Sequence, residues 1–232
     1  MQVIAAGLNP INQEDQLNYG LTYLHLDLAA PNSINDFVTN FCSRHTSLDY
    51  LVNNAGVMLV PYQQVSGNEM HYAVNYLGHV LLTEALLPKL SSSSIHPKVI
   101  NVCSSVHQVC LGIDPQDYCN VTEADYSPHL SYALSKLALA IYTADISQQH
   151  NIQAFAVHPG VVSSDLYRHV WLPLQFIQRW ILAPLFFRTV SEGALVVINC
   201  LLSDSPSELS GCYVDNGRYF PLYPSAGKVK QS

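Results

Sequence analysis

The sequence predicts an α/β fold built on a doubly wound parallel sheet. Short apolar runs of strand length alternate along the chain with longer stretches of helical spacing. Apolar residues make up 49% of the 232 residues and charged residues only 12%, which suits a sheet covered on both faces. Polar residues able to carry chemistry directly follow several of the expected strands, where such sheets bind their ligands.

Five apolar runs are expected to form buried strands, and a sixth is a candidate last strand. The five are Gln2–Ala6, Thr22–Leu26, Tyr50–Asn53, Lys98–Cys103 and Gln153–Val157, and the sixth is Leu209–Val214. Helical spacing extends over 33–46, 68–90, 130–149 and 189–202. A chain of this length supports one core, so we expect a single domain over 1–232.

Composition excludes several classes of protein. The formal charge is −7 with no basic block, so nucleic acid is not an expected partner. The six cysteines form no CxxC pair, which favours reduced core thiols, and no metal site is expected. The chain has no signal peptide pattern and no run of 18 uncharged apolar residues. We therefore expect an intracellular protein without an ordinary spanning helix.

Tyr132 and Lys136 are the first candidate catalytic pair. Four residues apart on a helix, their side chains share one face. An ammonium beside a phenol favours the phenolate, which makes the tyrosine usable as an acid/base near neutral pH. Solvated helix faces often show the same spacing, so this pair alone leaves both interpretations open.

Ser104 and Asn75 are further candidates. Ser104 follows an expected strand, and its hydroxyl could donate to a carbonyl or alcohol oxygen near the tyrosine. A local turn bond is the alternative, and Ser105 is the rival position. Asn75 lies in an apolar helical stretch, where an amide must be hydrogen-bonded. It could make a structural bond or hold a water molecule that links the lysine to solvent.

Three further places could bind a flat ligand. The turn Asn53-Asn54-Ala55-Gly56 has small residues that allow close approach to the backbone, although an Asn-rich turn is the plain alternative. Pro159-Gly160 makes a rigid bend, followed by backbone and hydroxyl donors at Val162 and Ser164. Asp27 could accept from an adenine amino group or cap the helix that follows.

Together these motifs resemble the short-chain dehydrogenase/reductase family over residues 2–214. The matching residues occur in the family's order: Asp27, Asn53-Asn54-Ala55-Gly56, Asn75, Ser104, Tyr132 with Lys136, and Pro159-Gly160. The resemblance implies a Rossmann-like fold with Tyr132 as acid/base and Ser104 as orienter of the reacting oxygen. It also implies that Lys136 binds the cofactor ribose and tunes the tyrosine, and that Asn75 anchors a proton relay.

The implied cofactor is NAD or NADP. Its expected contacts are Asp27, Asn53, Ala55, Gly56, Tyr132, Lys136, Pro159, Gly160, Val162 and Ser164. The residues after the first expected strand are Gly7, Leu8 and Asn9, which include neither an acid for a ribose diol nor an arginine for a 2′-phosphate. The choice between the two cofactors therefore stays open.

Within the family, the chain is most similar to the retinol-dehydrogenase-like branch and, within that, to the dehydrogenase/reductase X-linked type. The similar stretches are 53–58, 75–79, 126–129, 135–139 and 159–167. The resemblance implies hydride transfer between a nicotinamide cofactor and a lipophilic alcohol or carbonyl of the retinoid, steroid or prenol type. The expected location is a membrane surface of the endoplasmic reticulum or lipid droplet, with the cytoplasm as the alternative.

The chain departs from the family pattern at its beginning. The family starts with a strand and a glycine-rich turn that binds pyrophosphate at a helix N-terminus, and no such turn is found here. Gln2–Ala6 matches the family's second strand. We therefore expect a sheet missing its first βα unit, as in a truncated isoform. The alternative function is an impaired isoform that binds a lipid or a partner protein.

Residues 165–190 form an apolar segment where the family has its substrate lid. Both tryptophans lie within 170–187, which Pro173 and Pro184 interrupt. One interpretation is a lid that admits a lipid alcohol and makes peripheral contact with a membrane. The other is a helix pair that packs on the core or on the partner subunit of a homo-oligomer.

Overall fold

The computed structural model describes residues 2–149, 152–162, 188–204 and 207–222 as an α/β fold. Its main sheet has the order β3-β6-β7-β8-β9, in which the first four strands are parallel. These strands are β3 (Tyr50–Asn53), β6 (Lys98–Val102), β7 (Gln153–His158), β8 (Tyr213–Asp215) and β9 (Arg218–Phe220). The expected Rossmann-like architecture is confirmed.

The last strand differs from the expectation. The run Leu209–Val214 begins as a 3-10 turn (Ser207–Leu209), and strand β8 starts only at Tyr213. β8 then turns back into the antiparallel β9. Asn216 and Gly217 form this turn with φ angles of 50° and 73°, the conformation that suits a two-residue hairpin.

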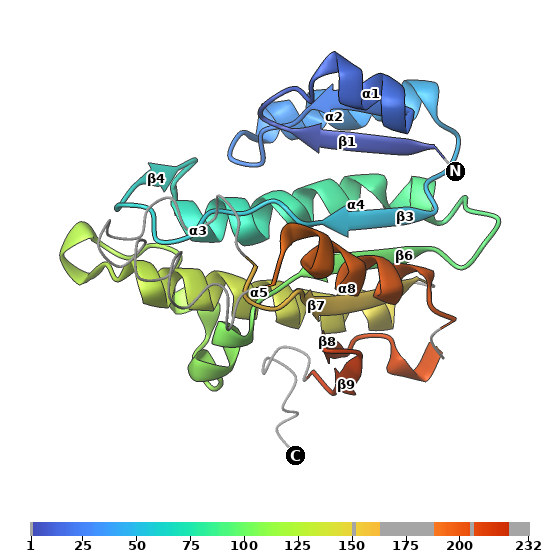
Figure 1. The fold of residues 1–232 in the computed structure, drawn as a ribbon. Helices are drawn as coiled ribbons and strands as arrows, with labels where there is room; N and C mark the ends of the chain where they lie inside the picture. Colours follow the sequence, from blue (N-terminus) through green and yellow to red (C-terminus); the bar gives the residue numbers. More distant parts are fainter. Residues whose placement is uncertain (1, 150–151, 163–187, 205–206, 223–232) are drawn as a thin grey trace.

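Two strands form a separate parallel sheet, as the missing βα unit predicts. These are β1 (Val3–Gly7) and β2 (Leu21–His25), joined by α1 (Gln13–Tyr19). Among the described residues no strand lies between β1 and β3, and the gap is visible in Figure 1. The sheet is therefore divided into two parts.

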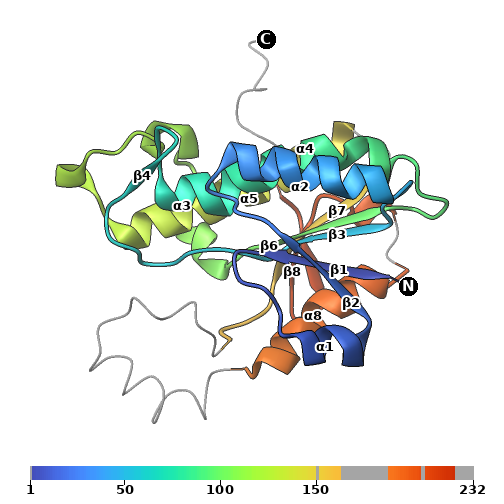
Figure 2. The same ribbon diagram turned by 90° about the horizontal axis from the view of Figure 1, so that it is seen from above.

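Helices hold the two parts together. α2 (Pro31–Arg44), α4 (Gly78–Leu90) and α5 (Pro128–Gln149) cover one face, while α1 and α8 (Val190–Leu202) lie on the other (Figure 2). Phe37 and Phe41 of α2 share one buried cluster with Leu82 and Leu86 of α4. Ile4 of β1 and Leu51 of β3 also pack against this cluster. The separation of β1 from β3 is thus set by side-chain packing.

The stretch expected as one helix over 68–90 is composite. It contains β5 (Asn68–Glu69), which pairs with β4 (Gln64–Val65), then α3 (Met70–Tyr72) and a π-helical turn η1 (Ala73–Leu77) before α4. Short 3-10 turns cover Ser105–Cys110 (η2), Pro115–Tyr118 and Glu123–Asp125. The π turn widens the helix at Asn75, which is one of the candidate residues.

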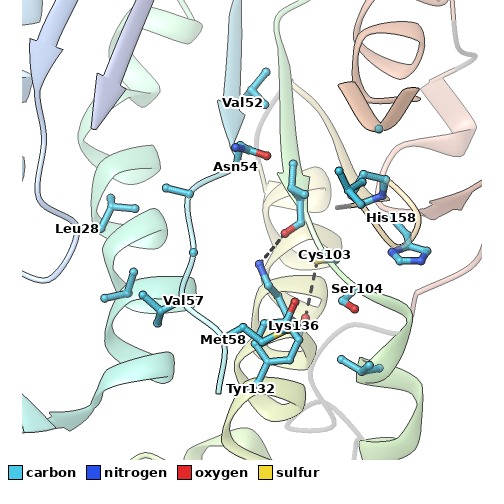
Figure 3. Close-up of a pocket in the computed structure, with 18 of the residues that line it drawn as sticks. Leu28, Val52, Asn54, Val57, Met58, Cys103, Ser104, Tyr132, Lys136 and His158 are labelled. Carbon is cyan, nitrogen blue, oxygen red and sulfur yellow. Dashed lines mark hydrogen bonds between the residues drawn. The ribbon is translucent and has the colours of Figure 1, made fainter. Parts of the chain in front are cut away.

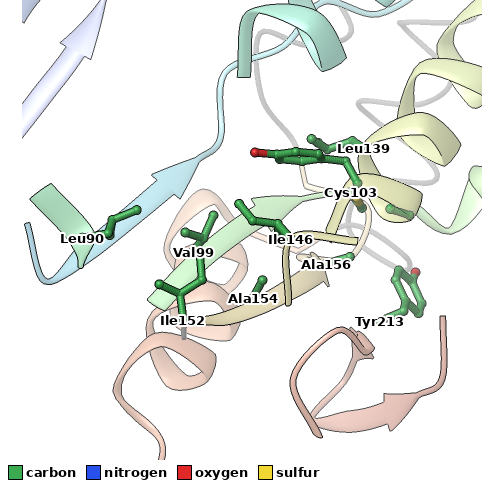
Figure 4. Packing of buried hydrophobic residues seen from close by; sticks show 11 residues of the cluster. Leu90, Val99, Cys103, Leu139, Ile146, Ile152, Ala154, Ala156 and Tyr213 are labelled. Atoms are coloured by element: carbon green, nitrogen blue, oxygen red, sulfur yellow. The ribbon is translucent and has the colours of Figure 1, made fainter. Parts of the chain in front are cut away.

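A second buried cluster fills the space between the main sheet and α5 (Figure 4). Leu139 and Ile146 of α5 pack there against Val99 of β6, Ala154 of β7 and Tyr213 of β8. This packing fixes α5 across the sheet and so sets the positions of Tyr132 and Lys136. In the part of the chain that the structure describes, no helix combines the length and the apolar character needed to cross a membrane.

Gly78, the first residue of α4, lies against the backbone of Leu28. A Cβ at Gly78 would lie 2.5 Å from the backbone oxygen of Leu28, which leads from β2 to α2. Alanine normally stabilises a helix by up to about 1 kcal/mol over glycine. Here the clash dominates, and we expect Gly78→Ala to lower the free energy of unfolding by about 1–3 kcal/mol.

Urea unfolding measures this effect, and Gly7→Ala is the matched control because no atom lies within 4 Å of a Cβ built there. A Gly78→Ala protein as stable as the wild type would show that α4 and the Leu28 backbone can separate without cost.

Candidate active site

A cleft of about 2000 Å³ lies at the carboxyl ends of the strands. The predicted residues that line it are Asp27, Ala55, Gly56, Ser104, Tyr132, Lys136, Pro159, Gly160 and Val162. Several of these side chains are seen together in Figure 3. Asn53 and Asn75 lie behind the cleft wall, and Ser164 lies outside the described residues. The fold thus gathers most of the predicted site, although the segments come from distant parts of the sequence.

Tyr132 and Lys136 lie one helical turn apart on α5 and face the cleft (Figure 3). Their exposed fractions are only 7% and 5%. Lys136 Nζ donates to the carbonyl oxygen of Val102 at 2.8 Å, which ties α5 to the end of β6. Burial lowers the pKa of the Lys136 ammonium. The burial excludes the solvated-face interpretation of this pair.

Ser104 extends from the end of β6 into the cleft. Its hydroxyl makes no capping bond to η2, so the local turn bond considered from the sequence is not what the structure has. Its carbonyl oxygen lies 2.6 Å from His107 Nδ1. Ser105 also lines the cleft, so the preference for Ser104 over Ser105 stays a prediction.

Asn75 is fully buried in the π turn and pins the turn after β3. Its Oδ1 accepts from the Val57 N–H at 2.8 Å, while Nδ2 donates to the Val57 carbonyl at 2.9 Å and to Ser135 Oγ at 3.0 Å. A Cβ at Gly56 would lie 3.0 Å from Asn75 Oδ1 and 3.6 Å from Lys136 Nζ. The amide therefore has the structural role, and the water-holding role stays a prediction.

The side chain of Asn53 points away from the cleft. Its Nδ2 donates to Thr83 Oγ1 at 2.9 Å and to Asn101 Oδ1 at 2.8 Å. Asn101 continues the buried network by donating to Thr143. The expectation that the Asn53 side chain meets a cofactor is not supported, because the pleat at the end of β3 turns this amide inward. Its neighbour Asn54 lines the cleft instead.

The prediction that Asp27 caps the following helix is wrong, because the N-cap of α2 is Ala30 and no side chain caps it. Asp27 Oδ1 accepts from the Ala29 N–H at 2.9 Å, and its own N–H donates to Ser33 Oγ at 2.9 Å. These bonds fix the turn that leads into α2. Asp27 also lines the cleft, and its contact with an adenine amino group stays a prediction.

His79 is a site residue that the sequence did not identify. It is 2% exposed, and its Nε2 lies 2.8 Å from the carbonyl oxygen of Ala55. Burial lowers its pKa to about 4, against a smaller opposite effect of the bond to Ala55. The neutral ring must therefore carry its hydrogen on Nε2. His79 and Asn75, four residues apart, hold the two sides of the Ala55–Val57 turn.

Because His79 is buried, we expect the free energy of unfolding to fall in acid. Its folded-state pKa of about 4 lies below the ordinary 6.5, so the unfolded chain binds the proton more tightly. The associated stability is present above pH 6.5 and is lost as the pH falls toward 4, by about 3 kcal/mol in total.

Urea midpoints measured across this range test the prediction. His79→Gln keeps an N–H donor for the Ala55 carbonyl but does not titrate, so its stability should depend less on pH. An identical pH dependence in both proteins would assign the acid sensitivity to other groups.

Comparisons with known proteins identify similar chains. A family model described as short chain dehydrogenase matches residues 4–112. Polyprenol dehydrogenase from Homo sapiens is 36% identical over 234 residues, which cover 93% of this chain and 69% of that protein. Retinol dehydrogenase 12 from Homo sapiens is 37% identical over 220 residues, covering 93% and 67%.

Solved structures show the same fold at lower identity. NADPH-bound carbonyl reductase from chicken fatty liver has a TM-score of 0.68 and 22% identity, covering 95% of this chain and 88% of that chain. The NAD complex of 3-oxoacyl-[acyl-carrier protein] reductase from Brucella melitensis has a TM-score of 0.68 and 18% identity, covering 92% and 84%. Both likenesses concern the fold alone.

Proposed function

The chain belongs to the short-chain dehydrogenase/reductase family, and from that premise we propose that it transfers a hydride between a nicotinamide cofactor and a lipophilic alcohol or carbonyl. The observation that carries the proposal is the buried pair Tyr132 and Lys136 at the wall of a cleft that also contains Ser104. One domain spanning 1–232 would perform this reaction.

Each candidate residue of the cleft has a distinct role in the proposed reaction. In the direction of oxidation, Tyr132 takes the proton of the alcohol oxygen while the hydride leaves the same carbon. The bound nicotinamide supplies the hydride acceptor. Ser104 donates to the reacting oxygen and fixes its position. The Lys136 ammonium stabilises negative charge on the phenol oxygen while the tyrosine is deprotonated. Asn75 acts indirectly, by holding the turn against which the nicotinamide half would lie.

The residues that line the cleft suit the nicotinamide part of the cofactor but not its pyrophosphate. Ala55 and Gly56 line the cleft with small residues, and a Cβ at Gly56 would crowd the Asn75 amide. The described residues that line the cleft include no glycine-rich turn for the pyrophosphate. Gly7, Leu8 and Asn9 line the cleft without a charged side chain, so we propose weak discrimination between NAD and NADP.

The substrate class is proposed from the relatives and the lining of the cleft. The relatives named above are polyprenol and retinol dehydrogenases. Many of the side chains that line the cleft are apolar, including Met58, Leu59, Met70 and Val109. We therefore favour long alcohols of the prenol or retinoid type over a role limited to binding a lipid or partner. Steroids are the remaining candidates.

The function is tested by incubating the protein with retinol or a polyprenol in detergent and millimolar NAD⁺ or NADP⁺. Nicotinamide absorbance and carbonyl product are measured together. Turnover of the lipophilic alcohols but not of ethanol is the expected result. Turnover of ethanol but not of the lipophilic alcohols would contradict the proposal. Turnover that is unchanged when Tyr132 is replaced would also contradict it.

The apolar segment 170–187 lies outside the described residues, so its role as a lid with membrane contact stays a proposal. Replacing Trp171, Phe176, Trp180 and Phe187 with polar residues is expected to weaken liposome binding, since each buried apolar side chain contributes roughly 1.5–3 kcal/mol. Flotation with liposomes measures this. Unchanged flotation would favour packing of the segment on the core or on a second subunit. A location at an internal membrane surface depends on this result.

A further inference from the structure

A buried histidine, His71, contacts the ring of Tyr132 from outside the cleft. The two ring centroids are 6.2 Å apart with an interplanar angle of 67°, an edge-to-face arrangement. His71 is fully buried and does not line the cleft. It follows β5 in the short helix α3, more than fifty residues before Tyr132 in the sequence. The reaction as derived above gives this histidine no task.

Glu69 fixes the orientation of the His71 ring. The His71 Nδ1–H donates to Glu69 Oε1 at 2.7 Å, and the side chains are 0% and 2% exposed. Glu69 Oε2 accepts from the Tyr72 N–H at 3.1 Å, and the Glu69 N–H donates to the Cys119 carbonyl at 3.0 Å. Among the described residues His71 Nε2 has no hydrogen-bond partner. The ring is therefore held through Nδ1.

The same histidine contacts Tyr126, which is hydrogen-bonded to the loop that follows the cleft residues Met58 and Leu59. The ring of Tyr126 lies 6.4 Å from that of His71 at an angle of 29°, and its hydroxyl lies 3.4 Å from His71 Nδ1. This hydroxyl donates to the Val60 carbonyl at 2.6 Å. Met58, two residues before Val60, lines the cleft and lies close to Tyr132 in Figure 3. His71 thus contacts Tyr132 of α5 directly and the loop 58–60 through Tyr126.

We propose that Glu69 and His71 are positioning residues for Tyr132, holding its ring at the angle that presents the phenol oxygen to the substrate. Burying a carboxylate and an imidazole costs desolvation energy, and an apolar pair of similar volume often stabilises a fold as well or better. The pair therefore does not need to be polar for stability alone. A polar bond fixes the direction of the His71 ring, which apolar packing alone would not.

This inference rests on the proposed acid/base role of Tyr132, and it makes a distinct kinetic prediction. When the Tyr132 ring is held less firmly, the protein still binds substrate, but the phenol oxygen is less often aligned with the reacting oxygen of the substrate. Small displacements of a reacting group lower the rate by up to about a hundredfold. Replacing both residues by leucine should therefore lower kcat about ten- to a hundredfold and change KM less than about threefold. Glu69→Gln, which keeps an acceptor for the His71 Nδ1–H, should retain most of the rate.

A spectroscopic test needs no turnover. 3-Fluorotyrosine placed at position 132 as the sole fluorine label reports the orientation of the ring by ¹⁹F NMR. Narrow, slowly exchanging signals are expected in the otherwise unchanged protein, and shifted or exchange-broadened signals in the Glu69→Leu/His71→Leu protein. Tyr142→Phe is the matched control. It removes a buried hydroxyl bond to Glu84, 2.8 Å long, from the same helix, and should leave the label unchanged.

The outcomes separate the two proposals. A leucine pair with unchanged fluorine signals and unchanged kcat would overturn the positioning role. If the wild-type protein turns over no alcohol, the proposed function is refuted. If the leucine pair still alters the fluorine signals in that case, the role of His71 in holding the Tyr132 ring stands. If the leucine pair does not fold, Glu69→Gln/His71→Phe carries the same test, since it keeps an aromatic ring and removes the bond that orients it.

Discussion

Replacing Tyr132 with phenylalanine is expected to lower kcat by about 10²–10⁴-fold, the usual loss for a positioned acid/base. The substitution removes one hydroxyl. The ring keeps its burial and its edge-to-face contact with His71, so the fold should survive. KM should change little, because substrate binding depends on the apolar walls of the cleft. Steady-state rates at millimolar cofactor measure the effect.

The controls for this result remove a single hydroxyl group at other positions. Tyr142→Phe removes a buried hydroxyl from the same helix and should cost little activity. Ser104→Ala should be severe and Ser105→Ala mild, although both side chains line the cleft. A Tyr132→Phe protein with full activity would refute the assignment of the acid/base. The reverse order of the two serines would move the orienting hydroxyl to Ser105.

Cofactor affinity is the second large effect. Among the described residues no strand lies between β1 and β3, and the cleft contains no glycine-rich turn to donate backbone N–H groups to a pyrophosphate. Charge-assisted hydrogen bonds contribute about 1.5–3 kcal/mol each. Without two of them, NADH and NADPH should bind about two or more orders of magnitude more weakly than in a complete site of this fold.

Isothermal titration measures both cofactors directly. Because Gly7, Leu8 and Asn9 carry no charge, the two dissociation constants should agree within about tenfold. Attaching a family-like strand and glycine-rich turn ahead of β1 should restore tight binding. Micromolar or tighter binding by the 232-residue chain itself would show that other residues hold the pyrophosphate.

Short apolar runs predicted β1, β2, β3, β6 and β7 to within one residue at each end. β3 was placed at Tyr50–Asn53, as the structure has it, because a short apolar run ended by turn residues has few alternatives. α1 was missed because none of its residues is buried and it has no apolar periodicity. The π turn was missed because one wider turn leaves the apolar spacing of 68–90 almost unchanged. β9 was missed although Asn216-Gly217 is a hairpin signal.

Local sequence patterns also predicted only part of the candidate site. Tyr132, Lys136 and Ser104 could be brought together from the sequence, because helix spacing and strand ends place them at one edge of the sheet. The inward direction of Asn53 depends on the pleat of β3 and on partners about thirty and fifty residues away. The hydrogen bond of His79 to Ala55 and the contact of His71 with Tyr132 join distant segments, which no local pattern encodes.

The divided sheet leaves two strand edges without a neighbouring strand in the part of the chain that the structure describes. β1 and β3 each turn one row of backbone N–H and C=O groups toward the gap, and Val3 and Val52 are each 39% exposed beside it. Bare strand edges with apolar side chains recruit strands of other molecules, and natural sheets usually protect them. Chaperones and proteases act on proteins with such edges, so when the 232-residue chain is produced by itself its steady-state amount should be set by quality control as much as by synthesis.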